Sequence, residues 1–210
     1  MINISTFNDK DVEVIKKTSL YRGFFKIEGY AFKHRLFAGG HSKVIHREIL
    51  ERGHAVAVLP YDPDTGNVLL IEQIRIGALA SKKNPWLLEC IAGMADGSTD
   101  YEHVVRKEAQ EEAGIELEQL EFMMSYLSSP GGTTERLFLY AARADLSQAG
   151  GLFGLASEGE DIKVHVLPFS QALELLADGT IDNAATVISL QWMALNQTRL
   201  MAQWANQTTC

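Results

Sequence analysis

The chain has 210 residues and a mass of 23.2 kDa, which suits one domain with an extension. Its composition is that of an ordinary globular protein, with 46% hydrophobic and 22% charged residues, and this argues against a disordered or fibrous chain. The formal net charge is −8. An acidic surface repels phosphate backbones, so general nucleic-acid binding is not expected. A phosphate-bearing ligand would need positive charge supplied locally, by a metal ion or a few arginines.

Cysteine usage and the N-terminal sequence both suggest a reducing compartment. The two cysteines are Cys90, in an apolar run, and Cys210 at the C-terminus. They form neither a disulfide framework nor a zinc-ligand pattern, and we expect Cys90 to be buried. The first residues lack the basic segment and apolar run of a signal peptide. No apolar run approaches the roughly 18 residues of a membrane helix, so a cytoplasmic protein without membrane contact is expected.

The N-terminal quarter predicts a small antiparallel sheet, because short β-like runs alternate there with glycines. These runs are Asp11–Lys16, Gly23–His34 and Lys43–Ile49. We therefore assign residues 1–50 to an N-terminal β subdomain and residues 51–210 to the main domain.

The main domain predicts a mixture of strands and helices. Ala55–Tyr61 and Val68–Ile76 flank a loop rich in turn formers, which indicates a hairpin of buried strands. Residues 147–160 are rich in glycine and predict a mobile loop. Further strands are expected at Trp86–Ile91, Leu120–Leu127, Arg136–Ala142 and Ile162–Leu167, and helices at Asp100–Ala113, Ser170–Ala177 and Ala184–Trp204. Without strict βαβ alternation, this order favours an α/β fold with a mixed sheet between helices.

The helix expected near residue 100 carries a cluster of carboxylates. Glu108, Glu111 and Glu112 stand at i, i+3 and i+4, so they share one helix face. Such a cluster is either a solvated acidic face or a site for hard divalent cations, which bind several oxygens. Spacing alone leaves both interpretations open.

Cap signals stand at both ends of this helix. Thr99 and Glu102 form the pattern of a capping box, which makes Thr99 the expected N-cap. Gly114 follows the last periodic residue, where a left-handed C-cap belongs.

The segment from Gly93 to Ile115 resembles the Nudix box. That pattern is glycine, five residues, glutamate, seven residues, then Arg-Glu-apolar-x-Glu-Glu-x-Gly-apolar. The matching positions are Gly93, Glu108, Ala109, Glu111, Glu112, Gly114 and Ile115. Two positions depart from it, because Thr99 stands where the family has its first glutamate and Lys107 where it has arginine.

Segments outside the box resemble the bacterial ADP-ribose pyrophosphatase branch of the Nudix hydrolase family. A proline follows the box in that branch, and Pro130 occupies the position here. The other similar segments are residues 21–25, 47–53, 71–75, 86–89, 160–166 and 181–192. The resemblance therefore extends over nearly the whole chain.

The resemblance implies a Nudix α/β/α sandwich and Mg²⁺-dependent hydrolysis of ADP-ribose to AMP and ribose 5-phosphate. The cation would neutralise the diphosphate and activate a water, whose proton a base removes. Two or three Mg²⁺ ions per site are implied, with Mn²⁺ as a second candidate. A homodimer that exchanges its N-terminal subdomains is implied as well. Hydrolysis of another nucleoside diphosphate sugar, or a catalytically weak ADP-ribose-binding module, are the alternatives.

The same resemblance assigns roles to individual residues. The implied metal ligands are Glu108, Glu112, Glu160 and the main-chain carbonyl of Ala92. Glu158 is the implied base, and Glu111 lies beside the metal as a direct or indirect ligand. The implied substrate-binding positions are Phe24, Phe25, Arg47, Glu48, Arg52, Arg75, Met94, Ser129, Pro130, Gly131 and Glu135.

Composition by itself offers simpler interpretations for some of these residues. Glu158 and Glu160 could be solvated loop acids, and Phe24 could belong to a strand core. In an extended loop, residues two apart point the same way. We therefore expect Glu158 and Glu160 to approach the carboxylate cluster together.

Overall fold

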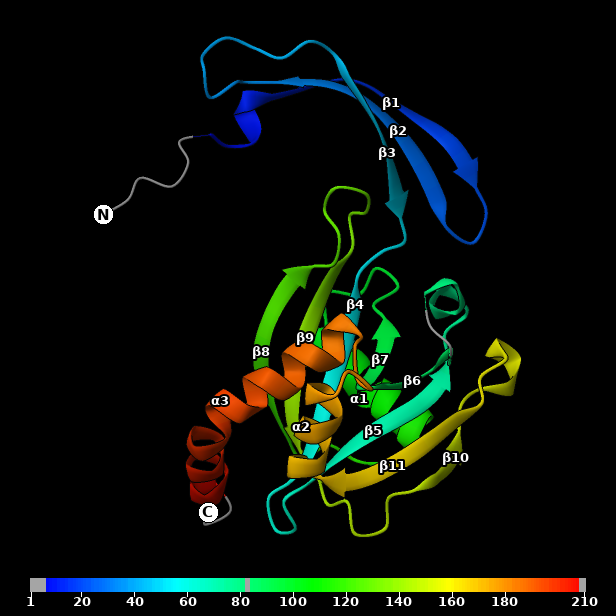
Figure 1. The fold of residues 1–210 in the computed structure, drawn as a ribbon, viewed down its shortest axis with the longest axis vertical. Coiled ribbons are helices and arrows are strands. Elements are labelled where there is room, and N and C mark those ends of the chain that lie inside the picture. Colours follow the sequence, from blue (N-terminus) through cyan, green and yellow to red (C-terminus); the bar gives the residue numbers. More distant parts are fainter. Residues whose placement is uncertain (1–6, 82–83, 208–210) are drawn as a thin grey trace. The chain divides into compact units, whose positions relative to one another are not determined.

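The computed structural model describes residues 7–81 and 84–207 of the chain (Figure 1). These residues divide into two compact units. The first contains the chain up to Gly53 together with Leu127–Glu135, and the second contains His54–Tyr126 and the chain from Arg136 onward. A segment distant in sequence thus joins the N-terminal unit.

The first unit is built on a three-stranded antiparallel sheet in the order β1-β2-β3, which confirms the predicted N-terminal sheet. The strands are β1 (Val12–Arg22), β2 (Lys26–His34) and β3 (Ile45–Glu51). Every residue of β1 is exposed. Among the residues that the structure describes, no apolar side chain of this unit is buried. The sheet therefore has no hydrophobic core of its own.

The second unit is built on a mixed sheet. Its central strand β4 runs parallel to β9 and antiparallel to β5 and β7. The strand order is β10-β11-β5-β4-β9-β8, with β6 paired to β5 and β7 paired to β4. The strands are β4 (Ala55–Asp62), β5 (Asn67–Ile74), β6 (Trp86–Glu89), β7 (Ile91–Met94), β8 (Gln119–Leu127), β9 (Arg136–Arg143), β10 (Gly151–Phe153) and β11 (Ile162–Pro168).

Helices cover both faces of this sheet, which confirms the predicted α/β/α sandwich. In β4, Val56 and Val58 pack in the cluster that contains the buried residues of α1, while Ala57 and Leu59 pack in the cluster of α2 and α3. The helices are α1 (Tyr101–Ala113), α2 (Phe169–Ala177) and α3 (Ala184–Gln207). Figure 1 shows α2 and α3 in front of the sheet and α1 behind it. None of the described helices is long and apolar enough to cross a membrane.

The single strand expected at Trp86–Ile91 is two strands, separated at Cys90. The first pairs with β5 and the second with β4. The strands β4 and β5 pair with each other only next to their connecting turn and separate beyond it. The segment that contains β6 and β7 therefore crosses from β5 to β4 at Cys90. The Cys90 N–H donates to the hydroxyl of Thr186 at 2.8 Å. Cys90 is buried as expected, and burial raises the pKa of its thiol to about 12.

The glycine-rich segment at residues 147–160 is more ordered than predicted. It contains β10, which pairs antiparallel with β11, and a 3₁₀ turn at Ala156–Glu158. The ring of Phe153 packs against Gly114, where a Cβ would come within 2.5 Å of it. Glycine composition reports local backbone freedom and gives no sign of this distant packing partner.

The N-cap prediction for α1 is wrong by one residue, whereas the C-cap prediction is confirmed. The Oδ1 of Asp100 accepts the His103 N–H at 3.1 Å, so Asp100 is the N-cap and Thr99 precedes it. Gly114 adopts the left-handed conformation with φ of 64°. Thr99 and Asp100 are both residue types that suit an N-cap. Which of them caps the helix depends on the path of the chain that enters it.

Candidate active site

The carboxylate face of α1 lies directly against β7. A Cβ on Gly93 would stand 2.1 Å from the carboxyl carbon of Glu108. Only glycine leaves room for this close approach. The first glycine of the box therefore has a local structural reason: it makes space for the side chain of Glu108.

Glu112 is the buried member of the cluster, with an exposed fraction of 3%. Its Oε2 accepts the Ala92 N–H at 3.0 Å, which places it beside the predicted main-chain ligand. Burial raises the pKa of Glu112 to about 8, and the charges of Glu108 and Glu160 add to this effect. A carboxylate in this environment is stabilised in its charged form when a cation approaches.

Lys107 contacts the other two glutamates of the cluster. Its Nζ lies 2.7 Å from Oε2 of Glu111 and 3.6 Å from Oε1 of Glu108. The pKa of Lys107 is raised, chiefly by the hydrogen bond to Glu111. Burial raises the pKa of Glu108 despite this lysine, and the nearby Glu160 contributes to the rise.

Glu158 and Glu160 have different surroundings. The Oε2 of Glu160 accepts the Leu155 N–H at 3.0 Å, and its charge raises the pKa values of Glu108 and Glu112. Glu158 is exposed at the end of a 3₁₀ turn. Gly159 between them is left-handed, with φ of 72°. The expected alternation of an extended segment is therefore wrong here, and the structure brings only Glu160 near the cluster.

The donor set suits a hard divalent cation, because Glu108, Glu112 and Glu160 supply carboxylate oxygens. The charge of Glu160 raises the pKa values of Glu108 and Glu112, which indicates a local excess of negative charge. In the described ranges, no group of three or more His, Cys, Asp or Glu side chains is arranged so that it could hold a metal ion. Each carboxylate instead contacts an N–H or an ammonium group.

Arg75 follows β5 at the start of a 3₁₀ turn, Ile76–Ala80. Its Nε donates to Oε2 of Glu89, at the end of β6, at 2.8 Å. Arg75 lowers the pKa of Glu112, which places it within electrostatic reach of the cluster. Met94 ends β7 and is half-buried. Glu89 was not expected as a site residue, and its only sequence signal is its place in the similar segment 86–89.

The other predicted substrate-binding residues lie in the first unit. Arg52, Phe25 and Glu135 form one cluster there: the Arg52 Nε lies 3.1 Å from Glu135 Oε1, and its guanidinium carbon lies 5.5 Å from the Phe25 ring centroid. Glu135 is only 8% exposed. Phe24 meets Phe25 edge-on at 4.9 Å and is 85% exposed, so it is not part of a strand core.

The predicted Ser129–Gly131 segment, which includes Pro130, is an exposed turn of the first unit. The Ser129 carbonyl accepts the N–H groups of Gly132 and Thr133, each at 2.9 Å. The Leu50 N–H, in β3, donates to the Gly132 carbonyl at 2.8 Å. The Leu50–Gly132 bond attaches the turn to the three-stranded sheet across 82 residues of sequence.

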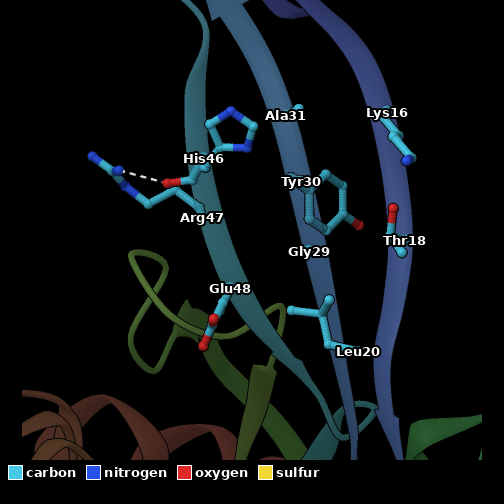
Figure 2. A pocket seen from close by; sticks show the side chains of 9 residues that line it. All are labelled: Lys16, Thr18, Leu20, Gly29, Tyr30, Ala31, His46, Arg47 and Glu48. Atoms are coloured by element: carbon cyan, nitrogen blue, oxygen red, sulfur yellow. Dashed lines mark hydrogen bonds between the residues drawn. The ribbon is translucent and has the colours of Figure 1, made fainter.

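A hollow of about 400 Å³ lies on the three-stranded sheet and includes Arg47 and Glu48 (Figure 2). Gly29, which has no side chain, and Ala31 line it from β2. Its other lining residues are Lys16, Thr18, Leu20, Tyr30 and His46. The Nη1 of Arg47 donates to the His46 carbonyl at 2.8 Å, and Figure 2 shows this arginine pointing away from β2.

Comparison with known families decides the classification: the NUDIX domain model matches residues 51–190. The chain belongs to the NUDIX family. It is 48% identical over 200 residues to the ADP-ribose pyrophosphatase of Escherichia coli strain K12, covering 95% of this chain and 96% of that one. Over 207 residues it is 46% identical to the ADP-ribose pyrophosphatase of Haemophilus influenzae, covering 97% and 95%.

More distant relatives include the GDP-mannose pyrophosphatase of Pectobacterium atrosepticum, 36% identical over 183 residues, with coverage of 86% of this chain and 92% of that one. Among solved structures, an ADP compounds hydrolase superposes with a TM-score of 0.68 at 17% identity, covering 90% of this chain and 96% of that one. At this identity the superposition supports the Nudix fold alone.

The two departures from the Nudix box have simple local consequences. Lys107, in the arginine position, still contacts Glu108 and Glu111, although an ammonium lacks the two-pronged geometry of a guanidinium. Thr99 is exposed and stands just before the N-cap of α1. Neither departure removes a predicted metal carboxylate.

Proposed function

We propose that this Nudix protein hydrolyses the diphosphate of ADP-ribose, giving AMP and ribose 5-phosphate. The observation that carries the proposal is the buried Glu112 of α1, which lies close to Glu108 of the same helix and to Glu160. Similarity over nearly the full chain to proteins named ADP-ribose pyrophosphatase supports the substrate.

A divalent cation would be held by Glu108, Glu112, Glu160 and the Ala92 carbonyl. When bound, it neutralises the diphosphate and lowers the pKa of the attacking water. We propose Mg²⁺, with two or three ions per site, and Mn²⁺ as a substitute. Glu158 is the proposed base, since an exposed residue on a turn can approach the water when substrate is present. Glu111 stays beside the ions.

Recognition of the substrate is proposed for both units of the chain. Arg75 and Met94 would contact the substrate next to the cluster, and a guanidinium suits a phosphate dianion. In the first unit, the adenosine and phosphate contacts are proposed for Phe24, Phe25, Arg47, Glu48, Arg52, Ser129, Pro130, Gly131 and Glu135. The cluster of Phe25 with Arg52 supports this, because it offers an aromatic ring and a cation together.

We propose that two copies form a homodimer through the N-terminal subdomain, residues 1–50, which each would supply to the other. A sheet whose described residues bury no apolar side chain supports this, because such a sheet requires a covering surface. The partner's subdomain would then complete the substrate pocket. The absence of nucleic-acid binding and a cytoplasmic location stay predictions.

The deciding experiment is a substrate panel with Mg²⁺, assayed for phosphomonoester products. We expect the highest kcat/KM for ADP-ribose. GDP-mannose is the second candidate substrate, because a GDP-mannose pyrophosphatase is 36% identical to this chain. A higher kcat/KM for GDP-mannose would replace the proposed substrate, and binding of ADP-ribose without turnover would favour a binding module.

A further inference from the structure

Arg75 and Glu89 project from the same face of the mixed sheet. Glu89 is paired in register with Ile71, which packs on the α1 side. Arg75 is extended, with φ of −121° and ψ of 96°, and continues the alternation of β5. Positions 71, 73 and 75 therefore share the α1 face, where Glu112 also lies.

The contact between these two residues involves one edge of the guanidinium. The Nε of Arg75 donates to Oε2 of Glu89 at 2.8 Å. The Glu89 side chain is 13% exposed, whereas that of Arg75 is 44% exposed. Within the described ranges, neither Nη group of Arg75 has a hydrogen-bond partner. The four Nη–H donors thus remain available, and parallel N–H groups of this kind bind phosphate oxygens in pairs.

Glu89 is a largely buried carboxyl that interacts with two side chains, Arg75 and Gln73. Burial raises the pKa of this carboxyl, and the charge of Arg75 opposes that rise. Gln73, on the same face, is buried, and its side chain also interacts with this carboxyl and opposes the rise in the pKa of Glu89.

We propose that Glu89 is a positioning residue that fixes the Arg75 guanidinium through Nε, so that both Nη groups face the diphosphate of the substrate. The inference rests on the proposed function, because it needs a substrate with a diphosphate. Glu89 itself touches neither the substrate nor the cation. It restricts the rotamers of Arg75 before the substrate arrives, which reduces the entropy lost on binding.

The test is a double-mutant cycle on ligand binding, measured by calorimetry in EDTA so that no hydrolysis occurs. The ligands are ADP-ribose and inorganic pyrophosphate, which carries the diphosphate alone. We expect Glu89→Gln to weaken binding of both roughly tenfold, equivalent to about 1.4 kcal/mol. We expect the double variant Arg75→Ala/Glu89→Gln to bind no more weakly than Arg75→Ala. With Mg²⁺, KM should rise more than kcat falls.

Glu118→Gln is the matched control, because Glu118 Oε2 contacts the Nε of Arg143 at 2.9 Å in a similar pair. It should bind both ligands as the unsubstituted protein does. If Glu89→Gln does not fold, Glu89→Asp replaces it in the test. Aspartate keeps the charge but is one methylene shorter, which moves the carboxylate away from the Nε of Arg75, so this variant should still weaken binding.

Binding within twofold of the unsubstituted protein for a folded Glu89 variant, or additive losses in the cycle, would overturn the inference. If the unsubstituted protein cleaves another nucleoside diphosphate sugar and ignores ADP-ribose, the proposed function fails. The pyrophosphate measurements then decide the role of Glu89 independently.

Discussion

Glu112 links burial, proton binding and cation binding in one side chain. In the folded protein the pKa of Glu112 is about 8, whereas the ordinary value for a glutamate is 4.5. Glu112 therefore keeps its proton to a higher pH in the folded protein than in the unfolded chain. An acid whose pKa rises on folding makes the metal-free protein less stable as pH increases between these two values. Glu112→Gln removes this loss, so at pH 8 we expect the metal-free variant to melt above the unsubstituted protein, with the difference shrinking toward pH 5.

Thermal unfolding in EDTA across this pH range checks the prediction. Glu111→Gln is the control, because the Glu111 side chain is 28% exposed and contacts Lys107. Identical pH dependence for Glu112→Gln and the unsubstituted protein would contradict the assigned environment of Glu112.

The same substitution should abolish most of the activity. Without its charge, residue 112 cannot hold the cation that stabilises the transition state. We expect Glu112→Gln to lower kcat by at least about 10³, roughly 4 kcal/mol of transition-state stabilisation. The assay uses saturating Mg²⁺, with circular dichroism to confirm the fold. A kcat near that of the unsubstituted protein would remove Glu112 from the metal site.

Glu158 and Glu160 should differ in how they respond to metal. Glu158→Gln should lower kcat by roughly 10²–10⁴, the usual contribution of a general base, without changing the Mg²⁺ requirement. Glu160→Gln should raise the Mg²⁺ concentration that gives half-maximal rate. A metal titration on both variants distinguishes the roles, and the opposite result would exchange them. If neither loses more than a few-fold in turnover, Glu111 and Glu135 are the next candidates for the base.

At the scale of secondary structure, the start of α1 provides a direct test of the corrected N-cap. Asp100 accepts the His103 N–H, so Asp100→Ala should reduce the free energy of unfolding by about 1 kcal/mol. Thr99→Ala is the matched control and should have little effect, since Thr99 is exposed. Urea denaturation of both variants measures this. A larger loss for Thr99→Ala would restore Thr99 as the cap.

At the scale of the whole molecule, the uncovered three-stranded sheet predicts self-association. Val14 on β1 is an apolar residue with an exposed fraction of 55%. We expect the protein to sediment as a dimer and Val14→Lys to shift it toward the monomer, because a buried charge costs several kcal/mol. Leu195→Lys, on an exposed residue of α3, should leave the dimer intact. A monomer mass for the unsubstituted protein would contradict the prediction.

The sequence by itself determined the features that depend on local pattern and chemistry. The period of α1, the left-handed Gly114, the two buried faces of β4 and the Nudix box could all be predicted, because each involves residues close together in the chain. The family resemblance extended this to the α/β/α sandwich, which the structure also shows.

Tertiary structure decided the features that depend on partners far apart in sequence. It divided the strand at Cys90, packed Phe153 of β10 against Gly114, and joined Leu127–Glu135 to the N-terminal unit. It also placed Glu89 on Arg75. Local propensity contains no information about such pairings, because the free energy that selects them comes from contacts formed only when the chain has folded.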